Sequence, residues 1–428
     1  MSTAPSLAER VAEGEAALLD EILAHRSIRA VYQPIVDLDS GVVIAWEALA
    51  RGPQGSALEL PDKLFGAAAR LGRTVELDQC CRVAAVDGAI AADLGRHQEL
   101  FVNVEPDTAG APVPAFLEAG RDRAQAQLRV TVEITERELT RDPGALVALV
   151  AHYRSRGWGI ALDDVGVDPR SVSLMPLLRP DVIKLDMAFV QHPLTRERAR
   201  IVHAVVAEAE RSGARVLAEG IETAEQALIA KTLGADLGQG WFFGRPGELR
   251  VGPDTEGIGR ARPVVDPAED TPYEHLSRLR PARPGTKRQL LAMSLVLEDQ
   301  ALAQGSSAVL LSTFQEAAFF PAQTRARYAM FSGRLAFVGA LAADLDTEPA
   351  LGVRGAALDP HEALLGEWDV VVLGPHFAGA FVARDLRDEG PDHDRRFDYV
   401  VTHDRDLVVA AATRLMRRIA PQSRQRPE

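Results

Sequence analysis

Residues 128–166 read LRVTVEITERELTRDPGALVALVAHYRSRGWGIALDDVG. Two runs in this stretch, residues 128–136 and 158–166, have the apolar, β-branched composition of buried strands. Between them, residues 143–156 carry apolar side chains at helical spacing. A strand, a helix and a second strand in this order predict two parallel strands joined by a helical crossover.

The same alternation extends along the chain in both directions. Further strand-like runs are IRAVYQPIVD (28–37), VVIAWEALAR (42–51), ELFVNVEP (99–106), DVIKLD (181–186), ARVLAEGIE (214–222) and DLGQGWFFGRP (236–246). Further helical stretches lie near residues 60–72, 78–94, 195–213 and 223–233. Eight strands that alternate with helices over about 220 residues predict an α/β fold, a TIM-type (β/α)8 barrel over residues 28–250.

One connection departs from the ideal barrel. Only residues 38–41, Leu-Asp-Ser-Gly, separate the first two strand-like runs. A parallel crossover needs about a dozen residues or more, whereas an antiparallel hairpin needs only a few. We therefore predict a barrel with one antiparallel strand.

The chain outside the barrel divides into four parts. An amphipathic helix over residues 6–25 belongs to an N-terminal segment, residues 1–27. Residues 251–267 are rich in Pro, Gly and charge and predict a linker. Residues 268–420 predict a smaller α/β domain, and residues 421–428 form a tail. The expected strands of the domain at residues 268–420 are 307–314, 335–341, 368–375, 379–386 and 398–404, followed by a helix at 406–419.

Composition excludes several classes of protein. Among 428 residues there are 61 acidic and 48 basic side chains, a net charge of −13, which argues against a general nucleic-acid binder. The sequence contains no run of about 18 consecutive apolar residues, so we expect no membrane span. The acidic N-terminus does not resemble a secretory signal. The two cysteines, Cys80 and Cys81, are adjacent, which excludes a disulfide framework and fits a reducing cytosol, so we expect a cytoplasmic protein.

Every predicted barrel strand ends in a polar residue, and strand ends form the catalytic face of this fold. These residues are Glu47, Asn103, Glu133, Glu136, Asp163, Asp164, Lys184, Glu219, Glu222 and Gln239. Asn103 is the only asparagine of the chain and Lys184 is one of four lysines. Taken singly, each residue has an ordinary alternative as a helix cap, a turn former or a solvated charge. Their coincidence at one end of so many strands favours a joint site.

Several carboxylates at one mouth repel one another unless cations neutralise them. All-oxygen ligands favour magnesium or manganese over zinc. The consecutive pair Asp163 and Asp164 can bridge two ions, an arrangement suited to two-metal phosphoester hydrolysis. We therefore expect two Mg²⁺ or Mn²⁺ ions as cofactors. No HExxH or Walker-A pattern points to another chemistry.

With these motifs in place, the sequence resembles the EAL domains, the cyclic di-GMP phosphodiesterases. The signature is AWEALAR at 45–51. The resemblance covers about residues 28–250 and includes QPIVD (33–37), NVEP (103–106), EITE (133–136), DD (163–164), KLD (184–186), AEGIET (218–223) and QGWFFGRP (239–246). The family fold is a barrel with a reversed first strand.

The resemblance implies a role for each matching residue. One metal would be held by Glu47, Asn103, Glu133 and Asp163, and the second metal or its water by Asp163, Asp164 and Glu219. Lys184 would contact the attacking water or the phosphate, and Glu219 would orient the water or take its proton. The substrate would be lined by Gln33, Leu49, Arg51, Gln239 and Glu222, with Glu136 supporting a loop. The product would be linear pGpG, and the expected assembly is a homodimer.

One loop departs from the family pattern. After the aspartate pair the family has a Phe-Gly-Thr-Gly type of loop, which is linked to dimerisation and metal ordering. Here residues 165–173 read VGVDPRSVS. This difference favours an alternative function, a receptor that binds cyclic di-GMP without cleaving it. A structural scaffold is a third class, disfavoured by the number of carboxylates at one mouth.

The C-terminal region resembles the DICT domain, a sensory module found with cyclic di-GMP and two-component proteins. The matching stretches are TKRQLLAMSLVLED (286–299), TFQEAAFF (313–320), EWDVVVLGP (367–375) and RRFDYVVTHDRDLV (395–408). The resemblance implies an unidentified ligand or protein partner for this domain. A packing or dimerisation role is the alternative.

Overall fold

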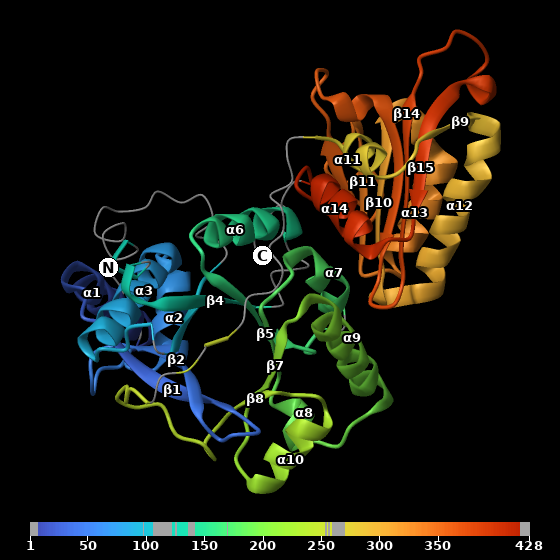
Figure 1. Ribbon diagram of the computed structural model, residues 1–428. Helices are drawn as coiled ribbons and strands as arrows, with labels where there is room; N and C mark the ends of the chain where they lie inside the picture. The colour runs from blue at the N-terminus through green and yellow to red at the C-terminus, as the bar shows by residue number, and fades with distance from the viewer. Residues whose placement is uncertain are drawn as a thin grey trace, which may run out of the picture.

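The computed structural model describes residues 7–96, 98–105, 122–124, 126–135, 142–168, 170–252, 255, 257–258 and 270–419 (Figure 1). Helix α1 (Leu7–His25) precedes the barrel and agrees with the predicted N-terminal helix. Its buried side chains Leu19 and Ile22 join one apolar cluster with Leu64 and Leu77 of the next two helices. Among the residues that the structure describes, no helix is both long and apolar enough to cross a membrane.

Eight strands close into a barrel in chain order, which confirms the predicted fold. Strand β1 is antiparallel to both of its neighbours, β2 and β8, and all other neighbours are parallel. The predicted single reversed strand is therefore correct and is the first one. The strands are β1 (Arg29–Asp37), β2 (Val43–Arg51), β3 (Glu99–Asn103), β4 (Arg129–Thr135), β5 (Gly159–Val165), β6 (Val182–Leu185), β7 (Arg215–Ala218) and β8 (Leu237–Gln239).

The hairpin between β1 and β2 follows from its turn residues. Asp37 Oδ1 accepts a hydrogen bond from the backbone N–H of Ser40 at 2.9 Å. Gly41 has a φ of +70°, a left-handed conformation that suits glycine. Because the turn is so short, β2 must run antiparallel to β1 and pair with it directly.

Helices surround the barrel strands. They are α2 (Pro61–Arg70), α3 (Thr74–Ala91), α6 (Pro143–Ser155), α7 (Ser171–Leu178), α8 (Ala188–Gln191), α9 (Arg196–Ser212) and α10 (Ala224–Thr232). The side chain of Asp142 caps the start of α6, and Thr223 with Gln226 forms a capping box at α10. The sequence did not predict α7 and α8, which are short.

Residues of the predicted linker contact the barrel where the structure describes them. Gly252 N donates a hydrogen bond to the side chain of Gln98 at 3.1 Å, and Ile258 N donates to Glu99 Oε2 at 3.2 Å. The Ile258 side chain is buried in one apolar cluster with Val182 and Leu237, which begin their strands. This part of the chain therefore covers the amino-terminal end of the barrel, opposite the predicted site.

The second domain has a seven-stranded sheet in the order β12-β11-β10-β13-β14-β15-β9. Its strands are β9 (Arg283–Thr286), β10 (Val309–Glu316), β11 (Phe337–Ala343), β12 (Arg354–Ala357), β13 (Glu367–Leu373), β14 (Ala378–Asp385) and β15 (Arg396–Thr402). Only β10, β11 and β12 pair in parallel. The sequence analysis missed β9 and β12. Pro284 and Gly285 are typical of loops, so the sequence does not indicate a strand here. Both residues are accepted in β9 because it is an edge strand of the sheet.

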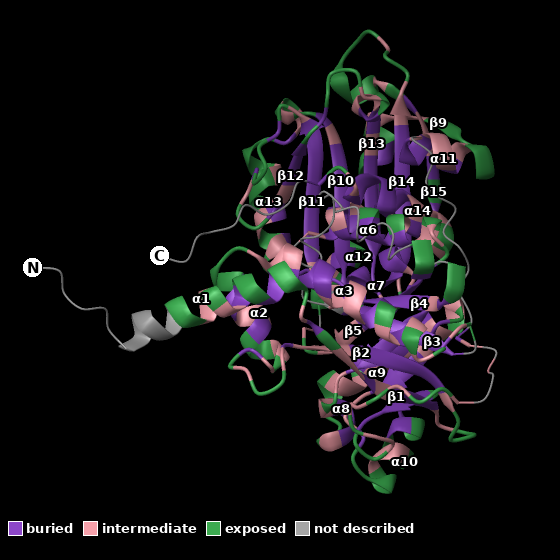
Figure 2. Ribbon diagram, turned by 90° about the vertical axis from the view of Figure 1, so that its left-hand side faces the viewer, coloured by how far each residue is buried: buried purple, intermediate pink, exposed green. Residues whose placement is uncertain are grey.

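Helices cover both faces of this sheet, so the second domain has three layers (Figure 1). Helices α12 (Lys287–Gln304) and α13 (Ala322–Ser332) pack on one face. Helices α11 (Pro272–Leu279) and α14 (Arg405–Met416) pack on the other. Figure 2 shows that the sheet strands between these layers are mostly buried.

Helix α14 also packs against the barrel, on α6 and α7. Val408 and Leu415 of α14 belong to the same buried apolar cluster as Leu146 of α6. A Cβ added to Gly144 in the first turn of α6 would lie 2.9 Å from the carbonyl oxygen of Met416. Glycine at this position therefore permits the close approach of the two domains.

Candidate active site

The polar side chains predicted at the strand ends meet at the carboxyl-terminal mouth of the barrel. Hydrogen bonds and ion pairs join them into a group that we call the mouth cluster. Its members are Glu47, Asn103, Glu133, Asp163, Lys184, Glu219 and Gln239. Asp164 adds a carboxylate oxygen within 4.8 Å of oxygens of Asp163 and Glu219.

Strand register brings these side chains together. Asn103 and Glu133 are direct partners across β3 and β4, and Gln33 and Glu47 are partners across β1 and β2. Residues that face each other on neighbouring strands have adjacent side chains on the same side of the sheet. In a barrel this side is the interior, so the cluster is a consequence of closure.

The aspartate pair depends on an irregularity of β5. Successive side chains of a regular strand point to opposite faces, so Asp163 and Asp164 would not both reach the mouth. The pairing of β5 with β6 shifts register between Leu162 and Val165, and Asp164 has a left-handed φ of +58°. This bulge brings oxygens of both aspartates within reach of Glu219.

Lys184 lies at the centre of the mouth cluster, with 1% of its side chain exposed. Its Nζ lies 2.6 Å from Glu133 Oε1, 2.9 Å from Asp163 Oδ1 and 2.8 Å from Glu219 Oε1. A fourth carboxylate oxygen, Glu47 Oε2, lies 3.8 Å away. One positive charge thus faces four carboxyl groups.

The pKa values reflect this imbalance of charge. Burial alone would lower the pKa of Lys184, but attraction to Asp163 and the other carboxylates raises it well above its ordinary value. Burial raises the pKa of Glu219 to about 8, although Lys184 opposes the rise. Burial and the charge of Glu47 raise the pKa of Glu133. Without another cation the cluster therefore favours protonated carboxyl groups.

The cluster has oxygen atoms suited to a divalent cation. Glu133 Oε1 and Asp163 Oδ1 are buried and contact Lys184 Nζ at 2.6 and 2.9 Å. Asp163, Asp164 and Glu219 can each direct one oxygen to a common point. Carboxylate oxygens are the ligands that magnesium and manganese prefer. These residues therefore fit the predicted metal chemistry.

Amide side chains hold the carboxylates in place. Asn103 Nδ2 donates to Glu133 at 3.1 Å and to Glu47 at 3.4 Å. Gln239 Nε2 donates to Glu47 and, at 3.4 Å, to Gln33. Asn103 donates through its side-chain nitrogen, and an amide oxygen is an acceptor.

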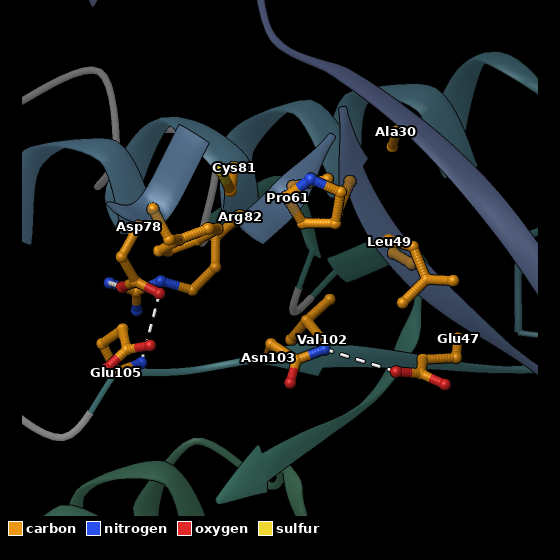
Figure 3. A pocket seen from close by; sticks show the side chains of 14 residues that line it. Ala30, Glu47, Leu49, Pro61, Asp78, Cys81, Arg82, Val102, Asn103 and Glu105 are labelled. Atoms are coloured by element: carbon orange, nitrogen blue, oxygen red, sulfur yellow. Dashed lines mark hydrogen bonds and ion pairs between the residues drawn. The ribbon is translucent and has the colours of Figure 1, made fainter. Parts of the chain in front are cut away.

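A cavity of about 270 Å³ opens beside Glu47 and Asn103 (Figure 3). Leu49, one of the predicted substrate residues, lines it, and so does Cys81. The cavity extends from the mouth cluster to helix α3, where Arg82 is labelled in the figure. A ligand in this cavity would reach the carboxylates from the side.

The sequence analysis missed a buried ion pair in this cavity. Arg82 and Asp78 of α3 are 2.7 Å apart, with side chains 8% and 3% exposed. Arg82 also donates to the hydroxyl of Tyr153 at 2.8 Å, and the backbone N–H of Glu105 donates to Asp78 at 3.2 Å. The sequence did contain one signal for this pair, because Asp78 and Arg82 are opposite charges four residues apart on a helix. Exposed ion pairs have the same spacing, so the spacing does not indicate that this pair is buried.

Three predicted site residues are not part of this arrangement. Arg51 donates to the neighbouring carbonyl oxygen of Ala50 at 2.8 Å and does not line the cavity. Glu222 is exposed just before α10, where its backbone N–H donates to Gln226. Glu136 lies outside the described residues.

The unusual loop after β5 is tightly packed at its start. Gly166 has a φ of +108°, and a Cβ there would lie 2.4 Å from the ring of Phe189. Val167 is half exposed, and Asp168 forms an ion pair with Arg170 at 2.9 Å. The loop leads directly into α7, the helix that contacts α14 of the second domain.

Comparison with known proteins agrees with both parts of this architecture. The model of the EAL domain matches residues 15–246, more than half of the chain. A second model, described as the sensory domain in diguanylate cyclases and two-component systems (DICT), matches residues 273–386.

Named relatives share the barrel region. A probable cyclic di-GMP phosphodiesterase, PdeB of Escherichia coli, is 31% identical over 53% of this chain and 44% of its own length. The cyclic di-GMP phosphodiesterase RocR of Pseudomonas aeruginosa is 30% identical over 52% of this chain and 58% of its own length. The chain thus spans less than two thirds of either relative.

Similar solved structures include the manganese and cyclic di-GMP complex of BlrP1 from Klebsiella pneumoniae. It is 30% identical, with a TM-score of 0.46, over 51% of this chain and 56% of that chain. The cyclic di-GMP complex of the PaMucR phosphodiesterase is 26% identical, with a TM-score of 0.47, over 54% of this chain and 97% of that chain. From the extent of the first family match, the chain belongs to the EAL domain family.

Proposed function

We propose that the barrel hydrolyses cyclic di-GMP to pGpG with two divalent cations, Mg²⁺ or Mn²⁺. The observation that carries this proposal is the mouth cluster, in which four carboxyl groups surround one buried lysine. Family membership and the names of the relatives support the substrate. A barrel with another role would not require so much buried negative charge at its mouth.

The proposed cation ligands form two overlapping sets. Glu47, Asn103, Glu133 and Asp163 would hold one cation, and Asp163, Asp164 and Glu219 would hold the other cation or its water. The four carboxyl groups around the single charge of Lys184, and the oxygens of Asp163, Asp164 and Glu219 within 4.8 Å of one another, support this division. When bound, divalent cations would lower the pKa of the attacking water and neutralise charge on the phosphate.

The protein side chains would then direct the proton and the charge. Glu219 would accept the proton of the attacking water, because its carboxylate lies beside Asp163 and Asp164, where the second cation would hold that water. The water oxygen would bond to phosphorus, the bond from phosphorus to the 3′ oxygen would break, and the product would keep a 5′ phosphate. Lys184 would stabilise the phosphoryl oxygens by its positive charge.

The cavity beside Glu47 gives the substrate a place to bind. Leu49 lines this cavity, and Gln33 and Gln239 lie next to it through their contacts with each other and with Glu47. We also propose Arg51 and Glu222 as substrate contacts, which requires movement of their side chains from the positions described above. The remaining wall, with Asp78 and Arg82, offers both signs of charge to a polar base.

A receptor that binds cyclic di-GMP without cleaving it is the second candidate. The altered loop at residues 165–173 favours it, because the loop follows the aspartate pair directly. The presence of every expected carboxylate favours the enzyme. Incubation of the full chain with cyclic di-GMP and Mn²⁺, with separation of products by chromatography, distinguishes the two. The enzyme forms pGpG and stops when EDTA is added, whereas the receptor returns the substrate intact.

We further propose that the second domain regulates the barrel through α14. This helix contacts α7, which begins where the loop after Asp163 and Asp164 ends. Asp406 at the start of α14 lies 3.1 Å from Arg179 at the end of α7. A shift of α14 would therefore change the population of loop conformations rather than the chemistry itself. Homodimer formation and a cytoplasmic location stay predictions from the sequence.

A further inference from the structure

The second domain contains a cavity of its own, far in sequence from the mouth cluster. It has a volume of about 290 Å³ and lies between α12, α13 and the sheet face formed by β10, β13 and β15. Pockets for small molecules are of this size or larger and occur between packed layers. This cavity shares no lining residue with the cavity beside Glu47, so it would hold an occupant of its own.

Aromatic side chains are enriched in the walls of this cavity. Aromatic residues make up 5% of the chain, yet Phe314, Phe319, Tyr328, Trp368 and Phe397 all line it. Several of them pack edge to face, as Phe314 does on Tyr328 with ring centres 5.4 Å apart and Trp368 on Phe397 at 5.6 Å. Aromatic walls favour a planar ring, which can stack on or pack against them.

One acidic group is buried in the same cavity. The side chain of Glu298 is 6% exposed, and its Oε1 accepts a hydrogen bond from the Tyr328 hydroxyl at 3.1 Å. Its Oε2 lies 2.9 Å from Arg327 Nε in an ion pair, and Arg327 Nη2 donates to Oε1 at 3.4 Å. A carboxylate can accept about four hydrogen bonds. Glu298 therefore has capacity for a donor brought by a ligand.

The strand that supplies the floor of the cavity is irregular at this point. Strand β10 shifts its register with β11 between Thr313 and Glu316. Within the shift, Gln315 has a left-handed φ of +59°, which is unusual for a residue other than glycine. Bulges and strained residues of this kind gather at binding sites, where they redirect side chains. This irregularity is independent of the aromatic walls and of Glu298.

The charges around the cavity balance. Lys287 pairs with Asp392 at 2.5 Å, and its ammonium group also lies 4.8 Å from the ring centre of Phe319. Arg327 pairs with Glu298. Since each cation already has an anion, the cavity offers no net positive charge to a phosphate or a carboxylate. An uncharged ligand suits it better.

We propose that this cavity binds a small uncharged heteroaromatic molecule of one or two rings, whose ring N–H donates a hydrogen bond to Glu298. The aromatic walls select the planar ring, the volume limits its size, and the carboxylate selects the donor. This site would give the second domain a ligand of its own, and the inference does not depend on the activity of the barrel.

The test compares two probes of the same shape. Indole has a ring N–H, whereas benzofuran has an oxygen in its place and cannot donate. Calorimetry on the full chain is expected to give a Kd for indole below about 1 mM and binding of benzofuran at least about tenfold weaker. Glu298→Gln is expected to remove this preference by weakening indole binding about tenfold. Equal binding of both probes to the unchanged protein would overturn the role of Glu298.

A second pair of variants tests the location. Thr324 of α13 lines the cavity, so Thr324→Trp is expected to block both probes. Met330 of the same helix is exposed and does not line the cavity, so Met330→Trp is the matched control and should leave the Kd unchanged. Circular dichroism shows whether each variant is folded. If indole fails to bind the unchanged protein, or binds the folded Thr324→Trp variant as before, the proposed site is wrong.

Discussion

The Nζ atom of Lys184 lies 2.9 Å from Oδ1 of Asp163, in a pair where the lysine side chain is 1% exposed. Burial of a charged pair is costly unless further contacts compensate, and here three more carboxyl groups approach the same lysine. The lysine therefore holds the mouth cluster together but leaves it with excess negative charge. A divalent cation is the natural complement to this arrangement.

The first prediction concerns Lys184 as an internal cation. Lys184→Met leaves the carboxyl groups without their partner, so the free energy of unfolding in EDTA should fall by about 3–5 kcal/mol. Urea unfolding measures this change. Lys231→Met is the matched control, because Lys231 is exposed in its ion pair with Asp39 and its loss should cost less than about 1 kcal/mol. Equal effects of the two substitutions would contradict the role given to Lys184.

The second prediction concerns pH. Burial raises the pKa of Glu219 to about 8, so between its ordinary value and pH 8 the folded protein holds a proton that the unfolded chain has lost. In EDTA the free energy of unfolding should therefore fall as the pH rises through this window, by up to about 1.4 kcal/mol per pH unit for one proton.

Saturating Mn²⁺ should reduce this pH dependence, because the cation takes over the neutralising role of the proton. Urea unfolding at several pH values with EDTA and with Mn²⁺ makes the comparison. Glu367 in the second domain, whose pKa burial raises to about 7, contributes equally under both conditions and cancels in the difference. An identical slope with and without Mn²⁺ would show that no cation binds at the mouth cluster.

The third prediction separates the two roles proposed for Glu219. If it accepts the proton, Glu219→Gln should lower turnover by about two to four orders of magnitude, since the amide cannot act as a base. The content of bound metal should stay nearly the same. Turnover and metal content are measured on the same preparation. A parallel loss of both would make Glu219 a ligand rather than a base.

The fourth prediction concerns the contact between the domains. Gly144→Ala places a Cβ 2.9 Å from the carbonyl oxygen of Met416, so the end of α14 must move away from α6. The packing of α14 on α6 should then loosen, which faster hydrogen–deuterium exchange of α14 would detect, and turnover should change in either direction. Gly14→Ala is the matched control, because Gly14 is also helical and has open space around it. Turnover that stays constant while the exchange of α14 becomes faster would exclude regulation through α14.

The barrel could be predicted because its evidence is local. The short connection at residues 38–41 alone excludes a parallel crossover, and the polar strand ends follow from the alternation of strands and helices. The bulge at Asp163 and Asp164 could not be predicted, since it depends on how β5 pairs with β6. The buried pair of Asp78 and Arg82 looks in the sequence like any exposed helical pair.

The contact between the domains could not be predicted either, because it depends on packing between residues that are far apart in the sequence. Gly144 lies in a helical pattern, and nothing near it in the sequence shows that Met416 approaches it. In the second domain, β9 was missed because Pro284 and Gly285 disfavour a strand interior, whereas the sheet edge accepts them. Tertiary packing decides each of these features, and local propensity does not report it.

The most direct measurement of the central claim is the rate of pGpG formation from cyclic di-GMP by the Asp163→Asn variant at saturating Mn²⁺. Asp163 belongs to both proposed ligand sets, so its loss should lower turnover at least about a hundredfold, while binding of cyclic di-GMP with Ca²⁺ weakens less. Asp62→Asn, an exposed position at the start of α2, should leave the rate unchanged. If the Asp163→Asn variant forms pGpG as fast as the unchanged protein, the mouth cluster is not the catalytic metal site.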